Sequence, residues 1–110
     1  MIVIKITMNV ISCKQLEMMQ TLISMIAPTV KETGCTSFDV FCDIEDKNRF
    51  CLIEEWKTRE YLDHHMASHR FGVLLGTKAL LREPLGILIH TVSHSEGIDA
   101  IHATREKKQI

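Results

Sequence analysis

Residues 1–10 form an apolar run that is rich in β-branched side chains, a pattern that favours a β-strand. Further along, apolar residues recur at the three- and four-residue spacing of one helix face. These residues are Leu16, Met19, Ile23, Ile26 and Val30. Ser12 and Gln15 have the spacing of a capping box, and Gly34 suits a helix end. We therefore expect a helix from Ser12 to Thr33.

The remaining chain predicts a hairpin, two helical stretches and a last strand. The strand-like runs 35–43 and 50–57 flank a polar turn. Thr58 can cap a helix that continues to about His69, and a second helical pattern follows over 71–81. A proline-glycine break precedes an apolar strand at 85–93. The order β-α-β-β-α-β is the split βαβ, ferredoxin-like arrangement of the α+β class. It predicts a four-stranded antiparallel sheet with both helices on one face.

The other face of this sheet is expected to be partly apolar. Val3 lies on the side of the first strand opposite Ile2 and Ile4, and the last strand is apolar on both sides. Two helices cannot cover both faces, so we expect a homodimer formed through the open sheet face. We assign residues 1–94 to one domain and residues 95–110 to a polar C-terminal tail that is frayed at its end.

Composition and charge limit the classes of partner and the cellular compartment that we expect for this protein. The 110 residues are 45% hydrophobic and 25% charged, as in ordinary globular domains. The formal net charge of -1 argues against nucleic acid and anionic membranes as partners. With no apolar run long enough for a bilayer and Lys5 inside the apolar start, we expect a cytoplasmic protein. The four cysteines are expected to be free thiols, although Cys42 and Cys51 could face each other across the hairpin.

Several short segments resemble the antibiotic biosynthesis monooxygenase domain family, and the resemblance extends over residues 1–93. The segments are Gly34-Cys35, Phe38-Asp39-Val40, Ile53-Glu54-Glu55-Trp56-Lys57-Thr58 and Tyr61-Leu62, followed by His65, Ser68 and Phe71. The resemblance implies a dimeric α+β barrel with a pocket between each sheet and its helices. It also implies, for some members, oxygenation of phenols or quinols without a metal, flavin or other cofactor.

Departures from the family pattern indicate a subgroup. Members that oxidise polycyclic phenols carry Asn and Tyr where this chain has Leu52 and Leu62. Haem-degrading members carry Trp and an iron-binding His where this chain has His65 and Leu75. The combination of Trp56, Leu62 and His65 is most similar to the quinol-oxidising members, and it is also similar to the branch that isomerises a phosphorylated sugar.

His65 is the first candidate for chemistry. It shares a helix stripe with Tyr61 and Leu62, which predicts that it faces the sheet. A partly buried imidazole titrates near neutral pH and can accept the proton of a quinol. The alternative is a core histidine that is satisfied by hydrogen bonds. A metal site at His65 and His69 is not expected, because no acidic residue stands at a fitting interval.

Glu54 is the expected partner of His65, because a buried carboxylate is costly unless it is paired. We expect Asp39 to lie opposite Glu54 across the hairpin. Trp56 offers a flat wall for an aromatic substrate, or else plain core packing. The other expected substrate contacts are Asp39, Leu52, Leu62, Tyr61, Phe41 and Phe71.

These residues support a cofactor-independent monooxygenase that acts on a small quinol or phenol with molecular oxygen. The catalytic residues would be His65, Glu54 and Trp56. Two alternatives stay open at this point. One is a proton-transfer isomerase of a small, phosphorylated sugar-like molecule, and the other is a binding module that does not turn its ligand over.

Overall fold

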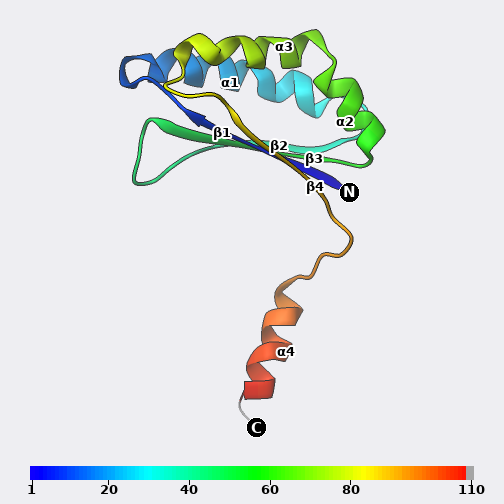
Figure 1. The fold of residues 1–110 in the computed structure, drawn as a ribbon. Helices are drawn as coiled ribbons and strands as arrows, with labels where there is room; N and C mark the ends of the chain where they lie inside the picture. The colour runs from blue at the N-terminus through cyan, green and yellow to red at the C-terminus, as the bar shows by residue number, and fades with distance from the viewer. Residues whose placement is uncertain (109–110) are drawn as a thin grey trace.

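Three helices cover one face of a four-stranded sheet (Figure 1), as described by a computed structural model of residues 1–108. The elements are β1 (Ile2–Asn9), the turn η1 (Ser12–Lys14), α1 (Gln15–Val30), β2 (Cys35–Cys42), β3 (Arg49–Trp56), α2 (Arg59–Met66), α3 (His69–Gly76), the turn η2 (Thr77–Leu80), β4 (Gly86–Thr91) and α4 (Ile98–Lys108). The predicted ferredoxin-like α+β fold, with its β-α-β-β-α-β order, is confirmed.

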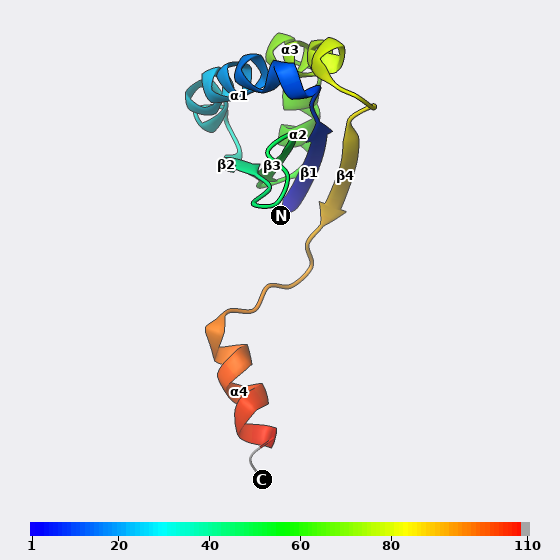
Figure 2. The ribbon, with the colours of Figure 1, turned by 90° about the vertical axis from the view of Figure 1, so that its left-hand side faces the viewer.

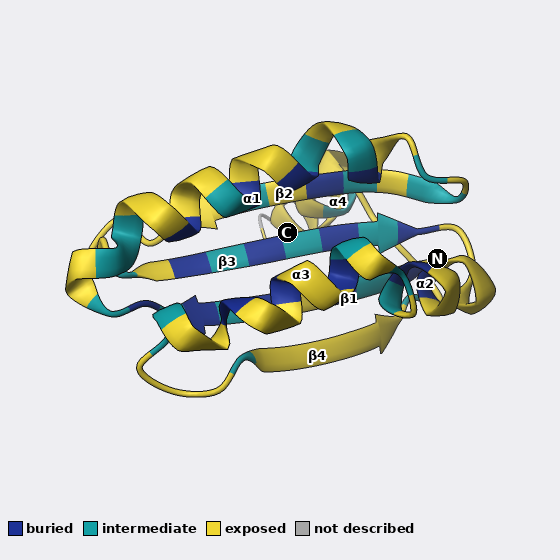
Figure 3. Ribbon diagram, turned by 90° about the horizontal axis from the view of Figure 1, so that it is seen from above, coloured by how far each residue is buried: buried dark blue, intermediate teal, exposed yellow. Residues whose placement is uncertain are grey.

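The strands lie in the order β2-β3-β1-β4, and all neighbours are antiparallel. On β1 the alternate residues Ile2, Ile4, Ile6 and Met8 are buried beneath the helices, as the alternation predicts. The helices do not reach the β4 edge, which Figure 3 shows as exposed along its length. Ile87 pairs with Ile6 and is still 40% exposed.

The hairpin has a different register from the one expected. Phe38, and not Asp39, lies opposite Glu54, while Asp39 pairs with Ile53 and Phe41 pairs with Cys51. The expectation that Asp39 faces Glu54 is therefore wrong, and Phe41, an expected substrate contact, does not share the face of Trp56. A shift of one residue moves every side chain of a strand to the other face. Asp39 and Phe41 lie on the outer face, where both are exposed.

The same register separates the two cysteines that were considered for a disulfide. Cys42 lies opposite Phe50 on the helix side, and Cys51 lies opposite Phe41 on the outer side. Cys42 and Cys51 are both free thiols, as are Cys13 and Cys35.

Helix α1 buries a different stripe from the one predicted. Its buried residues are Met18, Leu22, Met25 and Thr29, whereas Leu16 is 65% exposed and Ile23 is 59% exposed. The helix carries apolar residues on two sides. Periodicity alone therefore identified an apolar stripe, but this stripe is not the one that is buried. The expected capping box is also absent from this helix start, because Ser12 lies in η1 and no side chain caps Gln15.

Helices α2 and α3 begin at side-chain caps. The hydroxyl of Thr58 accepts from the backbone N–H of Tyr61, and the hydroxyl of Ser68 accepts from that of Phe71. The second cap lies just after α2 and fixes the start of α3. The predicted cap at Thr58 is confirmed.

Beyond β4, the chain leaves the domain and forms α4, which projects past the open sheet face (Figure 2). The expectation of a frayed end is wrong for Arg105 to Lys108, which are helical, and residues 109–110 of that tail lie outside the described residues. The division of the chain at residue 94 stays a prediction. No helix within residues 1–108 has the length and apolar character needed to cross a membrane.

Candidate functional site

Three polar or aromatic side chains meet between the sheet and α2. Glu54 pairs with Ile4 on one side and Phe38 on the other, so its side chain must point toward the helices. Trp56 lies two residues further along the same face of β3. His65 enters from the inner face of α2, and the three side chains are 0% exposed. The predicted proximity of Glu54, Trp56 and His65 is confirmed.

A continuous polar network runs through these groups. His65 Nδ1 donates to Glu32 Oε2 over 2.8 Å, and Arg70 donates to the same oxygen over 2.8 Å. His65 Nε2 lies 3.1 Å from Glu54 Oε1, which also accepts from Trp56 Nε1 over 3.1 Å. The network therefore passes from Arg70 through Glu32 and His65 to Glu54 and Trp56.

Two aromatic rings hold the imidazole in place. The ring of Trp56 stacks on His65 with a centroid distance of 4.7 Å and an interplanar angle of 29°. The ring of Phe71 meets the imidazole edge-on at 5.4 Å and 76°. This arrangement fixes the ring orientation, so each nitrogen has a defined carboxylate neighbour.

The surroundings of His65 favour its charged form. Burial by itself lowers the pKa of the imidazole, but the close carboxylates of Glu54 and Glu32 outweigh burial. The net effect is a pKa raised above the ordinary value of 6.5. Neutral His65, the form that can accept a proton, becomes abundant only at a pH above that ordinary value.

The hydrogen bonding between His65 and Glu54 is weaker than that between His65 and Glu32. The contact between His65 Nε2 and Glu54 lies within ion-pair distance but does not have the angle of a good hydrogen bond. Glu54 Oε2 is buried and has no hydrogen-bond partner among the described residues. An unsatisfied buried carboxylate oxygen is rare and is typical of sites with a chemical role.

Cys35 borders the network from β2, where it lies opposite Trp56. Burial, followed by the charges of Glu54 and Glu32, raises the pKa of the Cys35 thiol to about 11. The thiol is therefore protonated at neutral pH and is a poor nucleophile or metal ligand there. Within residues 1–108 no cluster of three or more His, Cys, Asp or Glu side chains is arranged to hold a metal ion.

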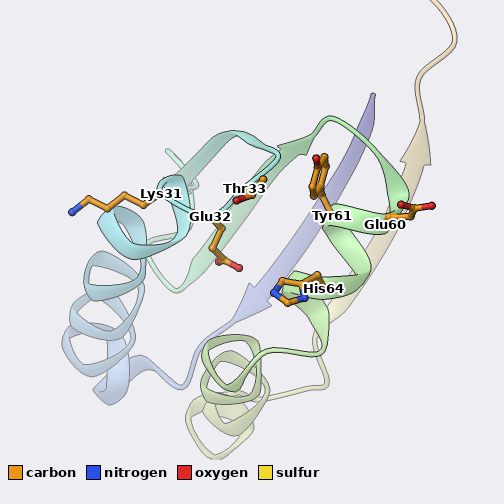
Figure 4. Close-up of a pocket in the computed structure, with 6 residues that line it drawn as sticks. All are labelled: Lys31, Glu32, Thr33, Glu60, Tyr61 and His64. Carbon is orange, nitrogen blue, oxygen red and sulfur yellow. The ribbon is translucent and has the colours of Figure 1, made fainter.

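A cleft opens beside the network, between the end of α1 and the start of α2 (Figure 4). Its volume is about 580 Å³, within the range of small-molecule sites. The residues that line it are Lys31, Glu32, Thr33, Glu60, Tyr61 and His64. Glu32 and His64 extend into the space between the two helices, whereas Lys31 and Glu60 extend outward (Figure 4).

Gly34 positions the aromatic wall of this cleft. Its φ of +87° is a left-handed conformation that suits glycine. A Cβ at this position would lie 2.2 Å from Cγ of Tyr61, so the phenol ring rests directly on the glycine backbone. Gly34 therefore both ends the α1 segment and seats Tyr61.

The predicted substrate contacts and Trp56 lie in four different places. Leu52, Leu62 and Phe71 are buried in the core on the helix side of the sheet, and Tyr61 lines the cleft. Asp39 and Phe41 are on the outer face and do not join them. Trp56 contacts the imidazole and is 0% exposed, so it does not form a wall of the cleft.

The sequence reading missed Glu32 and Arg70. Both belong to polar stretches that read as ordinary surface, and Glu32 is 33 positions from His65. A charged residue next to the helix-ending Gly34 is the only local signal, and it does not indicate which distant residue it will meet.

Fold and site together define a small α+β domain in which a buried ionisable network adjoins a ligand-sized cleft. The family model of the antibiotic biosynthesis monooxygenases matches residues 1–74. The chain belongs to this family.

Individual relatives agree with the fold and do not specify the activity. An uncharacterised protein of Synechocystis sp. is 28% identical over 74 residues, covering 66% of this chain and 50% of the relative. The chain thus spans half the length of that relative. A structure from Deinococcus radiodurans, provisionally assigned as an antibiotic biosynthesis monooxygenase, matches with a TM-score of 0.82 at 20% identity, covering 89% of this chain and 98% of that one. A conserved protein from Methanosarcina mazei matches with a TM-score of 0.77 at 29% identity, covering 81% and 89%.

Proposed function

We propose that this chain is a cofactor-independent monooxygenase that oxidises a small quinol or phenol with molecular oxygen. The observation that supports it most strongly is the buried Glu32–His65–Glu54 network next to a cleft of suitable size. Family membership supports the same class of activity. Tyr61 would provide the face against which an aromatic ring stacks.

The chemistry needs only what such a site can supply. Loss of a proton converts a quinol into an electron-rich anion that can pass an electron to oxygen. Recombination of the two radicals forms a carbon–oxygen bond, and elimination of water gives a hydroxyquinone. One oxygen atom enters the product and the other leaves as water, so no external reductant is required. The protein's task is to bind the quinol, accept its proton and limit access of water.

In this proposal His65 is the final proton acceptor, Glu54 stabilises the imidazolium, and Trp56 fixes the ring. Because the charged form of His65 is favoured at rest, kcat/KM should rise with pH through a pKa above 6.5. A phosphorylated sugar fits the cleft less well. Its lining has two carboxylates, Glu32 and Glu60, which would repel a phosphate, and one lysine, Lys31, that could bind it.

A homodimer through the outer sheet face is the second part of the proposal. This face carries Phe41 and Leu88, which are 50% and 57% exposed, beside the half-buried Val3 and Ile53. Sedimentation velocity should show a dimer that is weakened in Phe41→Lys. A wild-type monomer at tens of micromolar would contradict this part.

Oxygen uptake is the direct test of the activity. Metal-stripped protein is mixed with a panel of reduced naphthoquinols and benzoquinols, and dissolved oxygen and hydroxyquinone are followed. The test variant is His65→Gln, and the control is His69→Gln, an exposed histidine outside the cleft and the network. Protein-dependent uptake that is lost in the first variant and kept in the second supports the proposal. Uptake no faster than the buffer blank across the panel contradicts it, and ligand-dependent stabilisation without product would then favour a binding module.

A further inference from the structure

The cleft and the buried histidine are separated by one side chain. His65, Glu54 and Trp56 are 0% exposed, so a ligand in the cleft cannot touch them. The Glu32 side chain is 17% exposed. It lines the cleft and also contacts His65 Nδ1 at 2.8 Å. Among the described residues, Glu32 alone combines these two contacts.

We propose that Glu32 is the proton port of this site, which takes the proton from a hydroxyl bound in the cleft and passes it to His65. This inference rests on the proposed function, because it assigns the group that meets the quinol. It makes Glu32 the residue in contact with the substrate, and it makes His65 a residue that acts through Glu32.

The two oxygens of Glu32 have different neighbours. Oε2 accepts from both His65 Nδ1 and Arg70, which leaves Oε1 to accept from a ligand hydroxyl. The transfer begins with neutral His65 that carries its proton on Nε2, toward Glu54, so that Nδ1 has a free lone pair facing Glu32. The ligand proton moves to the Glu32 carboxylate, and Glu32 gives a proton to the imidazole nitrogen that faces it. No electrons move in this step, and the products are a ligand anion, the Glu32 carboxylate and an imidazolium.

The charges around His65 explain why it should receive the proton. The groups that face it are Glu54 from β3 and Glu32 from the turn after α1, and Arg70 of α3 is paired with Glu32. Cys35 adds no charge near neutral pH, because its pKa is raised to about 11. With imidazolium present, two positive and two negative groups cancel. With neutral imidazole, the network has a net negative charge, and uptake of the ligand proton restores neutrality.

Arg70 restrains the port. Its guanidinium holds Glu32 Oε2 at 2.8 Å, and it keeps the carboxylate oriented between α1 and α3. This contact keeps the carboxylate within 2.8 Å of His65 Nδ1, where a proton taken from the ligand can be passed on. Replacing Arg70 with Gln should therefore raise the pKa of His65, since one positive neighbour of the network is lost.

The test uses the resting full-length protein and needs no substrate. NMR of the histidine rings gives the pKa of His65 and the solvent exchange rate of its ring N–H. In Glu32→Gln, the pKa of His65 should fall and the exchange should slow. Glu60→Gln is the matched control, because it removes a carboxylate from the same cleft without contact to His65. Equal values in the two variants would overturn the proposal.

Turnover then separates this inference from the proposed function. On a quinol that the wild type oxidises, Glu32→Gln should lower kcat by about 100-fold, the scale of general acid–base catalysis. It should also flatten the pH profile. If Glu32→Gln retains wild-type kcat while His65→Gln is inactive, the oxygenase assignment stands and the port is wrong. If no quinol is oxidised but exchange at His65 still depends on Glu32, the port stands and the oxygenase assignment is wrong.

Discussion

Replacement of His65 by alanine tests whether the buried ion pairs are real. The substitution removes the imidazole but leaves Glu54, which is 0% exposed, without its positive neighbour. Breaking a buried pair by removing one partner costs about 3–5 kcal/mol, because the remaining charge is neither solvated nor compensated. Loss of the stacked contact with Trp56, at 4.7 Å, adds about 0.5–1.5 kcal/mol.

This magnitude is large for a small domain. The free energy of unfolding of a single domain is only about 5–15 kcal/mol, so His65→Ala should lose a large part of this stability. The effect should be coupled to Glu54. Because Glu54→Gln removes the uncompensated charge, the double variant should be more stable than His65→Ala alone, by about 1–3 kcal/mol.

Urea denaturation followed by circular dichroism at pH 6 gives the four free energies of this cycle. A cost below about 1 kcal/mol for His65→Ala, with no recovery in the double variant, would refute the buried ion pair. The same reasoning guides the choice of activity variant. An inactive His65→Ala protein could simply be unfolded, so the milder His65→Gln is the better probe of chemistry.

Three further predictions follow from particular contacts. Gly34→Ala should destabilise the protein by at least about 1–2 kcal/mol through its left-handed backbone alone, and it should also displace Tyr61. Gly76→Ala is the control, because the space around Gly76 is open and this variant should not be destabilised. Equal melting temperatures of the two variants would contradict this prediction. The free energy of unfolding should fall as the pH rises through the raised pKa of His65. The stabilisation from protonated His65 is complete below about pH 6.5 and is lost above the folded-state pKa, and it amounts to about 1.4 kcal/mol for each unit by which folding raises this pKa. Denaturation at pH 6 and pH 9 checks the sign, and a higher unfolding free energy at pH 9 would refute the prediction. Truncation after His94 removes α4, which has no extensive contact with the other elements, and calorimetry should show a change within about 0.5 kcal/mol; a larger loss would mean that α4 packs on a partner.

The strand alternation and the cap of α2 were readable from sequence. In β1 the two faces differ clearly, so the buried set of Ile2, Ile4, Ile6 and Met8 could be named in advance. Thr58 was recognisable because a hydroxyl before a polar-apolar helix has one common role. These signals are local, and local signals determine element order well.

Two errors came from patterns with more than one solution. In β2, Phe38 and Phe41 are both aromatic and lie on opposite faces, so the sequence does not show which one faces the core. The structure places a bulge between Cys35 and Ser37, which changes the phase of this strand at its start. In α1, the stripes that contain Leu22 and Ile23 are both apolar, and only the packed structure distinguishes them.

The buried part of the site was predicted from the sequence, whereas only Tyr61 was predicted among the residues on its cleft side. His65 was identified because it shares a helix stripe with Leu62, and Glu54 because a buried carboxylate needs a partner. Glu32 and Arg70 are ordinary surface residues by sequence, and they become part of the site only because α1 ends where α3 begins to cover the sheet. Contacts of this kind depend on tertiary packing, so no pattern within one segment reveals them.

The energetics of the network argue for a chemical role in preference to a structural one. An apolar pair in place of Glu54 and His65 would fill the same space without burying charge, and such replacements are often neutral or stabilising. The protein instead keeps a carboxylate whose Oε2 has no partner among the described residues, at a cost of about 1–3 kcal/mol. Nothing in the packing of the sheet requires that group. What it does provide is a negative charge beside the nitrogen of His65 that faces away from Glu32, so that the imidazole can hold a proton received from the cleft side. In the proposed mechanism, this cost in stability serves the uptake of a proton by His65 from the cleft side.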